Sequence, residues 1–289
     1  ALIYSKVDAK AVGTFTQNIV KAAPVLWDKM IVDNYDHVRI IAVNSGVANA
    51  CTGDEGLKCN EEFAQTVADN FGLEKEEVLI CSTGVIGKQL PMNKIINGVP
   101  IVKPLLSESQ EAGVIVAESI MTTDTKPKHL AVEIEVGGKT VTLGACCQGS
   151  GMIHPNMATM LAFITCDANI SSETLQLALS QNVETTFNQI TVDGDTSTND
   201  MVLVLSNGCT LNEEILPDTP EFDKFSAMLN YVMQELAKKI AKDGEGASKL
   251  IEVNVKNAPN ALDARMMAKS VVGSSLVKTA IFGEDPNWG

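Results

Sequence analysis

The sequence predicts a mixed α/β fold in which helices cover β-sheets. Short apolar runs typical of buried strands alternate with amphipathic helical patterns along the whole chain. The 289 residues are 45% hydrophobic and 20% charged, a globular composition that excludes general disorder. No apolar run approaches the ~20 residues that a membrane helix needs, so we expect no membrane partner.

The strands are predicted from continuous apolar runs. Residues 38–43 (VRIIAV) and 78–81 (VLIC) have the composition of buried strands. Residues 130–136 and 140–143 flank Gly137-Gly138, a pair typical of a hairpin turn. Further strands are expected at 160–164 (MLAFI), 201–205 and 251–255.

Three helices are predicted from caps and from spacing. Ser107-x-x-Gln110 has the pattern of a capping box that opens a helix towards Ile120, and Ser171 can cap a helix through Val183. Apolar residues from 222 to 240 recur every three or four positions and form one stripe, which Gly244 terminates.

Charge and cysteine content narrow the function classes. The chain has 22 Lys and Arg against 36 Asp and Glu, a net charge of −14 that disfavours nucleic-acid binding. A local basic pocket for a small acidic ligand remains compatible with it. The seven cysteines show no C-x-x-C spacing, which indicates free thiols in a reducing compartment, hence the cytoplasm.

Four polar, glycine-rich segments follow or precede predicted strands: 44–53 (NSGVANACTG), 82–87 (STGVIG), 148–159 (QGSGMIHPNMAT) and 191–200 (TVDGDTSTND). Each alone is compatible with an ordinary turn, because these residue types favour turns. Four of them together predict backbone amides and hydroxyls gathered at one end of a sheet.

Standard motifs do not explain these segments. Gly84 to Lys88 lacks the spacing of a phosphate loop, and Asp193 to Val204 lacks the central glycine and final glutamate of a calcium loop. His37, His129 and His154 have no ligand-like spacing and no evident catalytic partner. We therefore expect no metal site and a chemistry that works largely without histidine as base.

A threonine remains as candidate nucleophile. Thr159 lies where a tight loop enters the predicted strand 160–164. A chain break before Thr159 would free its α-amine, of pKa ~8, to act as base for its own hydroxyl. The small Ala158 would let that hydroxyl reach the preceding carbonyl, and amides of 82–84 could stabilise the oxyanion. The alternative is a threonine that makes an ordinary hydrogen bond at a strand start.

Seven short segments are distributed along the chain from one end to the other. They are VNSGVANACTG, STGVIGKQLP, MTTDTKPK, GSGMIHPNMATML, ITVDGDTSTND, DGEGASK and LVKTAIFGEDPNWG. Together they resemble the ornithine acetyltransferase family of arginine biosynthesis, also called glutamate N-acetyltransferases. The resemblance implies a sandwich of two β-sheets flanked by helices, as in the threonine-nucleophile aminopeptidases and amidases.

The resemblance also implies an activity. Family members cleave themselves, here between Ala158 and Thr159, into an α chain (1–158) and a β chain (159–289). They move acetyl from N2-acetyl-L-ornithine to L-glutamate by a ping-pong route through an acetyl-threonine, and assemble as two α and two β chains. The expected partners are thus small molecules and the chain's own cleaved product. No cofactor is expected, and acetyl-CoA is a candidate co-substrate because some members use it as donor.

Site residues carry over by matching position. Thr159 would be the nucleophile, and Thr83 with Gly84 would form the oxyanion hole. Glu245 matches a family acid beside the substrate, and Thr122 is a further substrate-pocket candidate. Gln148, also in the expected substrate site, replaces the usual lysine of the family and would offer neutral hydrogen bonds to a carboxylate.

Two further departures leave rival functions open. Val47 replaces a common asparagine, and family members continue past the final DPNWG into a C-terminal domain that this sequence does not include. One rival is a threonine-nucleophile aminopeptidase or amidase with water as acceptor, which Gln148 motivates. The other is an uncleaved, non-catalytic binding or assembly module, which the missing domain motivates.

Overall fold

The computed structural model describes residues 1–154 and 160–286. Ala158 and Thr159 lie outside the described residues. The described strands are β1 (Leu2–Phe15), β2 (Val38–Val47), β3 (Val78–Val85), β4 (Lys128–Val136), β5 (Lys139–Gln148), β6 (Leu161–Cys166) and β7 (Met201–Ser206). The described α-helices are α1 (Ala23–Asn34), α2 (Gly53–Phe71), α3 (Met92–Val102), α4 (Gln110–Ser119), α5 (Ser172–Val183), α6 (Pro220–Lys242), α7 (Ala261–Gly273) and α8 (Ser275–Phe282).

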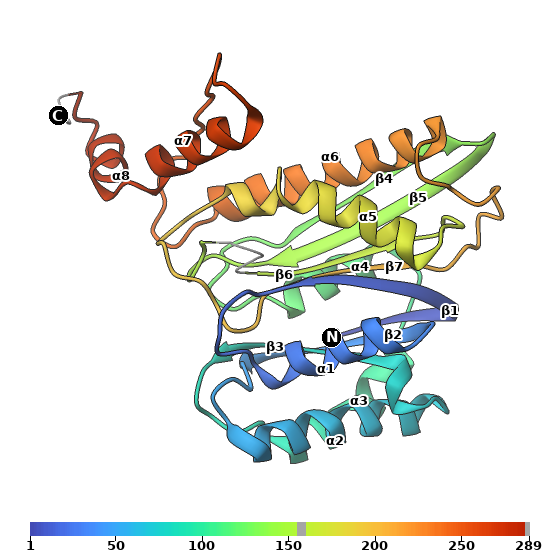
Figure 1. The fold of residues 1–289 in the computed structure, drawn as a ribbon. Helices are drawn as coiled ribbons and strands as arrows, with labels where there is room; N and C mark the ends of the chain where they lie inside the picture. The colour runs from blue at the N-terminus through green and yellow to red at the C-terminus, as the bar shows by residue number, and fades with distance from the viewer. Residues whose placement is uncertain (155–159, 287–289) are drawn as a thin grey trace.

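One long strand joins two β layers. The strands of the described chain run in the order β3-β2-β1-β7-β6-β5-β4. The first part of β1, up to Ala9, pairs with β2, and the part from Lys10 onward pairs with β7, both antiparallel. The register shifts between Tyr4 and Ala9, where the strand turns from one layer to the other. Figure 1 shows β2 and β3 in a lower layer, β4 to β7 above them, and β1 passing from one layer to the other.

Side-chain alternation shows that both faces of each layer are covered. In β2, Ile40 and Ala42 pack under α2 and α3, whereas Ile41 points into the space between the layers. In β7, Val204 packs against α5 and α6, and Leu203 points into the same interlayer space. The expected sandwich of two β layers flanked by helices is therefore confirmed (Figure 1).

Most elements predicted from the sequence are present. Apolar runs 38–43, 78–81, 160–164 and 201–205 lie in or overlap β2, β3, β6 and β7. The β4–β5 hairpin turns at Gly137 and Gly138, whose φ values of +56° and +73° explain the glycine pair. Ser171 caps α5 as predicted, with its Oγ accepting from the Thr174 amide at 3.2 Å.

Two local predictions were wrong. Residues 251–255 form no strand, although they alternate between half-buried and exposed side chains. The N-cap of α4 is Ser109, whose Oγ accepts from the Ala112 amide. Ser107 instead accepts from the Ser109 amide and fixes the turn before the cap.

Helices α7 and α8 project from the layers at one end of the molecule (Figure 1). Neither helix contains a buried residue. Among the helices of the described chain, none combines the length and apolarity required to cross a membrane.

Candidate active site

A cavity of about 810 Å³ opens at one edge of the two β layers. The carboxyl ends of β2, β3 and β5 meet there with the amino ends of β6 and β7. All four glycine-rich segments contribute to it, as the sequence predicted. The described lining residues are Ser45, Gly46, Ala48, Thr83 to Ile86, Met121 to Thr123, Gln148 to Met152, Met160, Leu161, Asp195, Ser197, Asn199, Asp200 and Glu245.

The ends of β2 and β3 approach each other unusually closely. The two strands are parallel, and Gly46 is the register partner of Gly84. Gly84 has a φ of +127°, and a Cβ added to it would lie 2.6 Å from the Cα and the carbonyl oxygen of Gly46. Only glycine fits this position, which places the Thr83–Gly84 peptide at the cavity wall.

Asn199 ties three segments of the site together. Its side-chain amide donates to the carbonyl oxygen of Ala48 at 2.6 Å and to that of Ser82 at 2.8 Å. The Thr198 hydroxyl donates to the Asn199 Oδ1 at 2.7 Å. Asn199 is buried, so these bonds replace water for two strand-end carbonyls. Our sequence argument placed Asn199 in a site loop but did not single it out; a polar residue just before a buried strand was the available signal.

Three predicted substrate residues line one wall. The Thr122 hydroxyl lies 3.5 Å from the Oε1 of Gln148, which is buried at the end of β5. The Glu245 amide donates to the Ser150 carbonyl at 2.9 Å. The Glu245 carboxylate lies against Gly151, where an added Cβ would collide with it. Segments from three distant parts of the sequence thus meet here, as the resemblance implied.

The segment before β6 contains the expected nucleophile. Ala158 and Thr159, the expected cleavage pair, lie outside the described residues. Met160, the residue after Thr159, lines the cavity, and its carbonyl accepts from the Met201 amide at 3.0 Å. Thr83 and Gly84, the expected oxyanion residues, line the same cavity.

The described lining is acidic. It contains the carboxylates of Asp195, Asp200 and Glu245 and no lysine, arginine or histidine. A cavity wall with this charge attracts ammonium groups and repels carboxylates.

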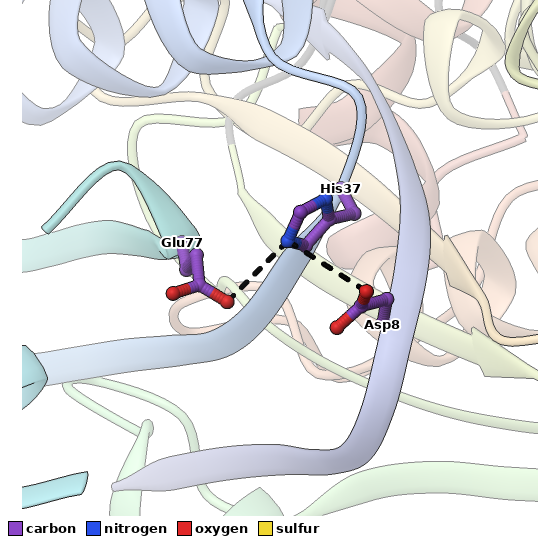
Figure 2. Close-up of side chains that lie close together, drawn as sticks. All are labelled: Asp8, His37 and Glu77. Carbon is purple, nitrogen blue, oxygen red and sulfur yellow. Dashed lines mark ion pairs between the residues drawn. The ribbon is translucent and has the colours of Figure 1, made fainter. Parts of the chain in front are cut away.

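His37 has partners that the sequence did not reveal. Figure 2 shows its ring between Asp8 and Glu77, with Nε2 3.8 Å from Asp8 Oδ2 and 3.4 Å from Glu77 Oε1. These three are the one group in the described chain whose ligand atoms could surround a metal ion. Arg39 lies 3.5 Å from Asp8 Oδ1 and supplies a cation there. The group lies where β2 and β3 begin, at the opposite end of these strands from the cavity.

Comparison with known proteins shows the family to which this chain is similar. The ArgJ family model matches residues 1–289. The "Arginine biosynthesis bifunctional protein ArgJ" of Streptococcus thermophilus is 63% identical over 287 residues, which cover 99% of this chain and 71% of that protein. The protein of the same name from Staphylococcus epidermidis is 57% identical over 288 residues, again 99% and 71%.

A solved structure is also similar. The crystal structure of arginine biosynthesis bifunctional protein argJ from Bacillus halodurans is 40% identical, with a TM-score of 0.51, over 54% of this chain and 81% of that chain. The family model spans the whole chain, and the relatives exceed half identity over nearly all of it. This chain belongs to the ArgJ family.

Proposed function

We propose that this chain transfers acetyl from N2-acetyl-L-ornithine to L-glutamate by way of an acetyl-Thr159 intermediate. Membership of the ArgJ family makes it an acetyltransferase of arginine biosynthesis. The observation that carries the mechanism is the cavity in which Thr83, Gly84, Thr122, Gln148 and Glu245 meet beside the residue that follows Thr159.

The proposed reaction begins with cleavage of the chain. The Thr159 hydroxyl attacks the Ala158 carbonyl, and the Ala158–Thr159 C–N bond breaks as the acyl group moves to the hydroxyl oxygen, which frees the Thr159 α-amine. Water then hydrolyses the resulting ester and releases the Ala158 carboxylate and the Thr159 hydroxyl. The products are residues 1–158 and 159–289. The α-amine, with an ordinary pKa of about 8, then serves as base for the hydroxyl of the same residue.

Transfer follows in two halves. The Thr159 hydroxyl attacks the acetyl carbonyl of acetylornithine, the amide C–N bond breaks, and ornithine leaves with a proton on its amine. The amine of glutamate then attacks the acetyl ester and releases the threonine hydroxyl. Amides at Thr83 and Gly84 stabilise the oxyanion in both halves, a contribution of about 10²–10³ in rate per donor.

The acidic lining supports a donor with a free ammonium group. Acetylornithine carries an ammonium at the end of its side chain, which Asp195 or Glu245 can pair with. Gln148 offers the glutamate carboxylate a neutral hydrogen bond only, so we expect weak binding of the acceptor.

Gln148 also favours one competing activity. A cavity without a cation for the carboxylate of the acceptor gives water an advantage, and the same acyl-threonine would then be hydrolysed. The second candidate function is therefore that of an amidase or aminopeptidase. An uncleaved binding module is a third candidate. For the transferase we propose an α2β2 assembly in the cytoplasm, where the seven free cysteines of the chain would remain reduced.

Intact mass and product analysis separate these functions. Two fragments meeting at Ala158/Thr159, absent in Thr159→Ala, are expected, with acetylglutamate formed from acetylornithine and glutamate. Release of acetate without formation of acetylglutamate would contradict the transferase and support the amidase or aminopeptidase. If the parent protein and Thr159→Ala both stay as one intact chain and neither turns over substrate, the result would support the uncleaved binding module.

A further inference from the structure

A buried cation lies behind the substrate wall. The Lys128 ammonium contacts Asp124 Oδ1 at 2.5 Å and Asp243 Oδ2 at 2.6 Å. The exposed fractions of the three side chains are 2% for Lys128, 0% for Asp124 and 10% for Asp243. Taking three charges out of water is costly, and apolar residues of similar size often serve stability equally well. Asp124 and Asp243 also bind backbone and side-chain groups of the cavity wall.

Asp124 fixes two parts of the wall. Its Oδ1 accepts from the Gly149 amide at 2.8 Å, and its Oδ2 accepts from the Thr122 amide at 3.1 Å. Gly149 directly follows Gln148, so one carboxylate sets the position of both predicted substrate residues Thr122 and Gln148.

Asp243 fixes the third part. Its Oδ2 accepts from the Thr125 amide at 3.0 Å, and its backbone carbonyl accepts from the Ser150 hydroxyl at 2.7 Å. The Ser150 carbonyl in turn accepts from the amide of Glu245. Burial raises the pKa of Asp243, but hydrogen bonds from Lys128 and Thr125 more than offset this, and the pKa lies below its ordinary value. The carboxylate is thus charged at neutral pH.

We infer that Lys128, Asp124 and Asp243 act together as a positioning unit. The unit holds Thr122, Gln148 and Glu245 in the relative positions in which they bind the acetyl donor. Lys128 bridges the two carboxylates. The Asp124 carboxylate binds the amides of Thr122 and Gly149, and the Asp243 carboxylate binds the amide of Thr125, close to Thr122 in the chain. None of the three lines the cavity, so none is expected to touch substrate. The inference rests on the proposed function for the identity of the substrate.

The test uses an isosteric variant, Asp124→Asn. The amides of Gly149 and Thr122 bind different oxygens of the Asp124 carboxylate. An asparagine places an NH2 group where one of these oxygens lies, and this donor opposes one of the two backbone amides. Lys128→Met is a second variant, but it leaves two carboxylates without their cation and its folding must be checked. The matched control is Asp167→Asn. Asp167 Oδ1 accepts from the Thr142 amide at 2.8 Å, near the other end of β5.

Loss of one such bond is expected to raise KM for acetylornithine about tenfold in Asp124→Asn. The kcat should change by less than about threefold, because the oxyanion residues lie on another wall. Self-cleavage, read by intact mass, should remain complete. Amide hydrogen exchange should accelerate in peptides covering 121–125 and 148–151 only. Asp167→Asn should leave KM and both peptides unchanged.

The kinetics and the hydrogen exchange together test the positioning unit. An unchanged KM in Asp124→Asn, with an active parent protein, would overturn the inference, as would equal losses in both Asp→Asn variants. A parent protein without acetyl transfer would overturn the proposed function instead. In that case unchanged hydrogen exchange at 121–125 and 148–151 would overturn the positioning unit, and acceleration confined to these peptides would support it.

Discussion

Replacing Gly84 by alanine tests the site geometry most directly. The Cβ of Gly84→Ala would lie 2.6 Å from two backbone atoms of Gly46, whereas ordinary contact begins at 3.4 Å. The carbonyl carbon of Gly46 would lie closer still, so the strand ends must separate by more than about 0.8 Å, and misplacement on that scale can lower a rate about 100-fold. The positive φ adds a strain of about 1–3 kcal/mol.

The displaced peptide is the one we assign to the oxyanion hole. Loss of one such donor lowers kcat by about 10²–10³, equivalent to about 2.7–4 kcal/mol. We therefore expect Gly84→Ala to slow acetyl transfer by about 100-fold or more. Self-cleavage should slow as well, because it passes through the same kind of oxyanion.

Gly87→Ala provides the matched control. Gly87 has a φ of +77°, but nothing lies within 4 Å of its added Cβ, so this variant carries the backbone strain without the collision. Initial rates of acetyl transfer and the cleaved fraction by intact mass are measured beside thermal melting. Both melting temperatures should fall, that of Gly84→Ala further because it adds the collision, while only Gly84→Ala should lose activity. If the two variants transfer acetyl within about threefold of each other, the close approach of β2 and β3 is not part of the mechanism.

The remaining predictions concern thiols, a buried amide and pH. Cys51 and Cys209 are exposed and should be alkylated first at pH 8, whereas burial raises the pKa of Cys146 to about 12, so it should react only after unfolding; peptide mass spectrometry checks the order. Asn199→Leu leaves two carbonyls without their donor and should lower the free energy of unfolding in urea by about 2–4 kcal/mol; a loss below about 0.5 kcal/mol would contradict the tie. Burial and nearby lysines lower the pKa of His154 below 6.5, so the folded protein prefers the neutral imidazole and protonation of His154 favours unfolding. Stability should be full above pH 6.5 and fall as pH drops towards the folded pKa, and urea midpoints at pH 7.5 and 5.5 should differ less in His154→Gln than in the parent.

The sequence predicted the elements whose patterns are purely periodic. The apolar stripe of α6 was predicted because one face of that helix is buried along its length. The apolar run of β7 was predicted because both faces of that strand are buried. The first strand, β1, was not predicted. Its residues Lys6 to Asp8 are exposed where it passes between layers, which interrupts the alternation. Residues 251–255 alternate like a strand but pair with none in the described chain.

The site was predictable to the extent that its residues lie in loops beside strands. Gly84 lies against the backbone of Gly46, and Gly151 lies against the carboxylate of Glu245, so both positions need a residue without a side chain. The unit of Lys128, Asp124 and Asp243 was not predictable by the same means. Lys128 and Asp243 lie 115 residues apart, and neither is in a glycine-rich turn at a strand end. Only the packing of α6 against β4 brings them together.

The strand order has a consequence for a chain cut after Ala158. Strand β5 precedes that point and pairs with β6, which follows it; β1 and β7 form a second such pair. The two pieces would share both outer hydrogen-bonded edges of the β6–β7 pair and a common apolar interior. Without the first piece, β6 and β7 would lose their neighbouring strands on both sides. A scission at that bond would therefore leave the molecule in one body, because the piece that carries β6 and β7 stays hydrogen-bonded to the other piece on both sides.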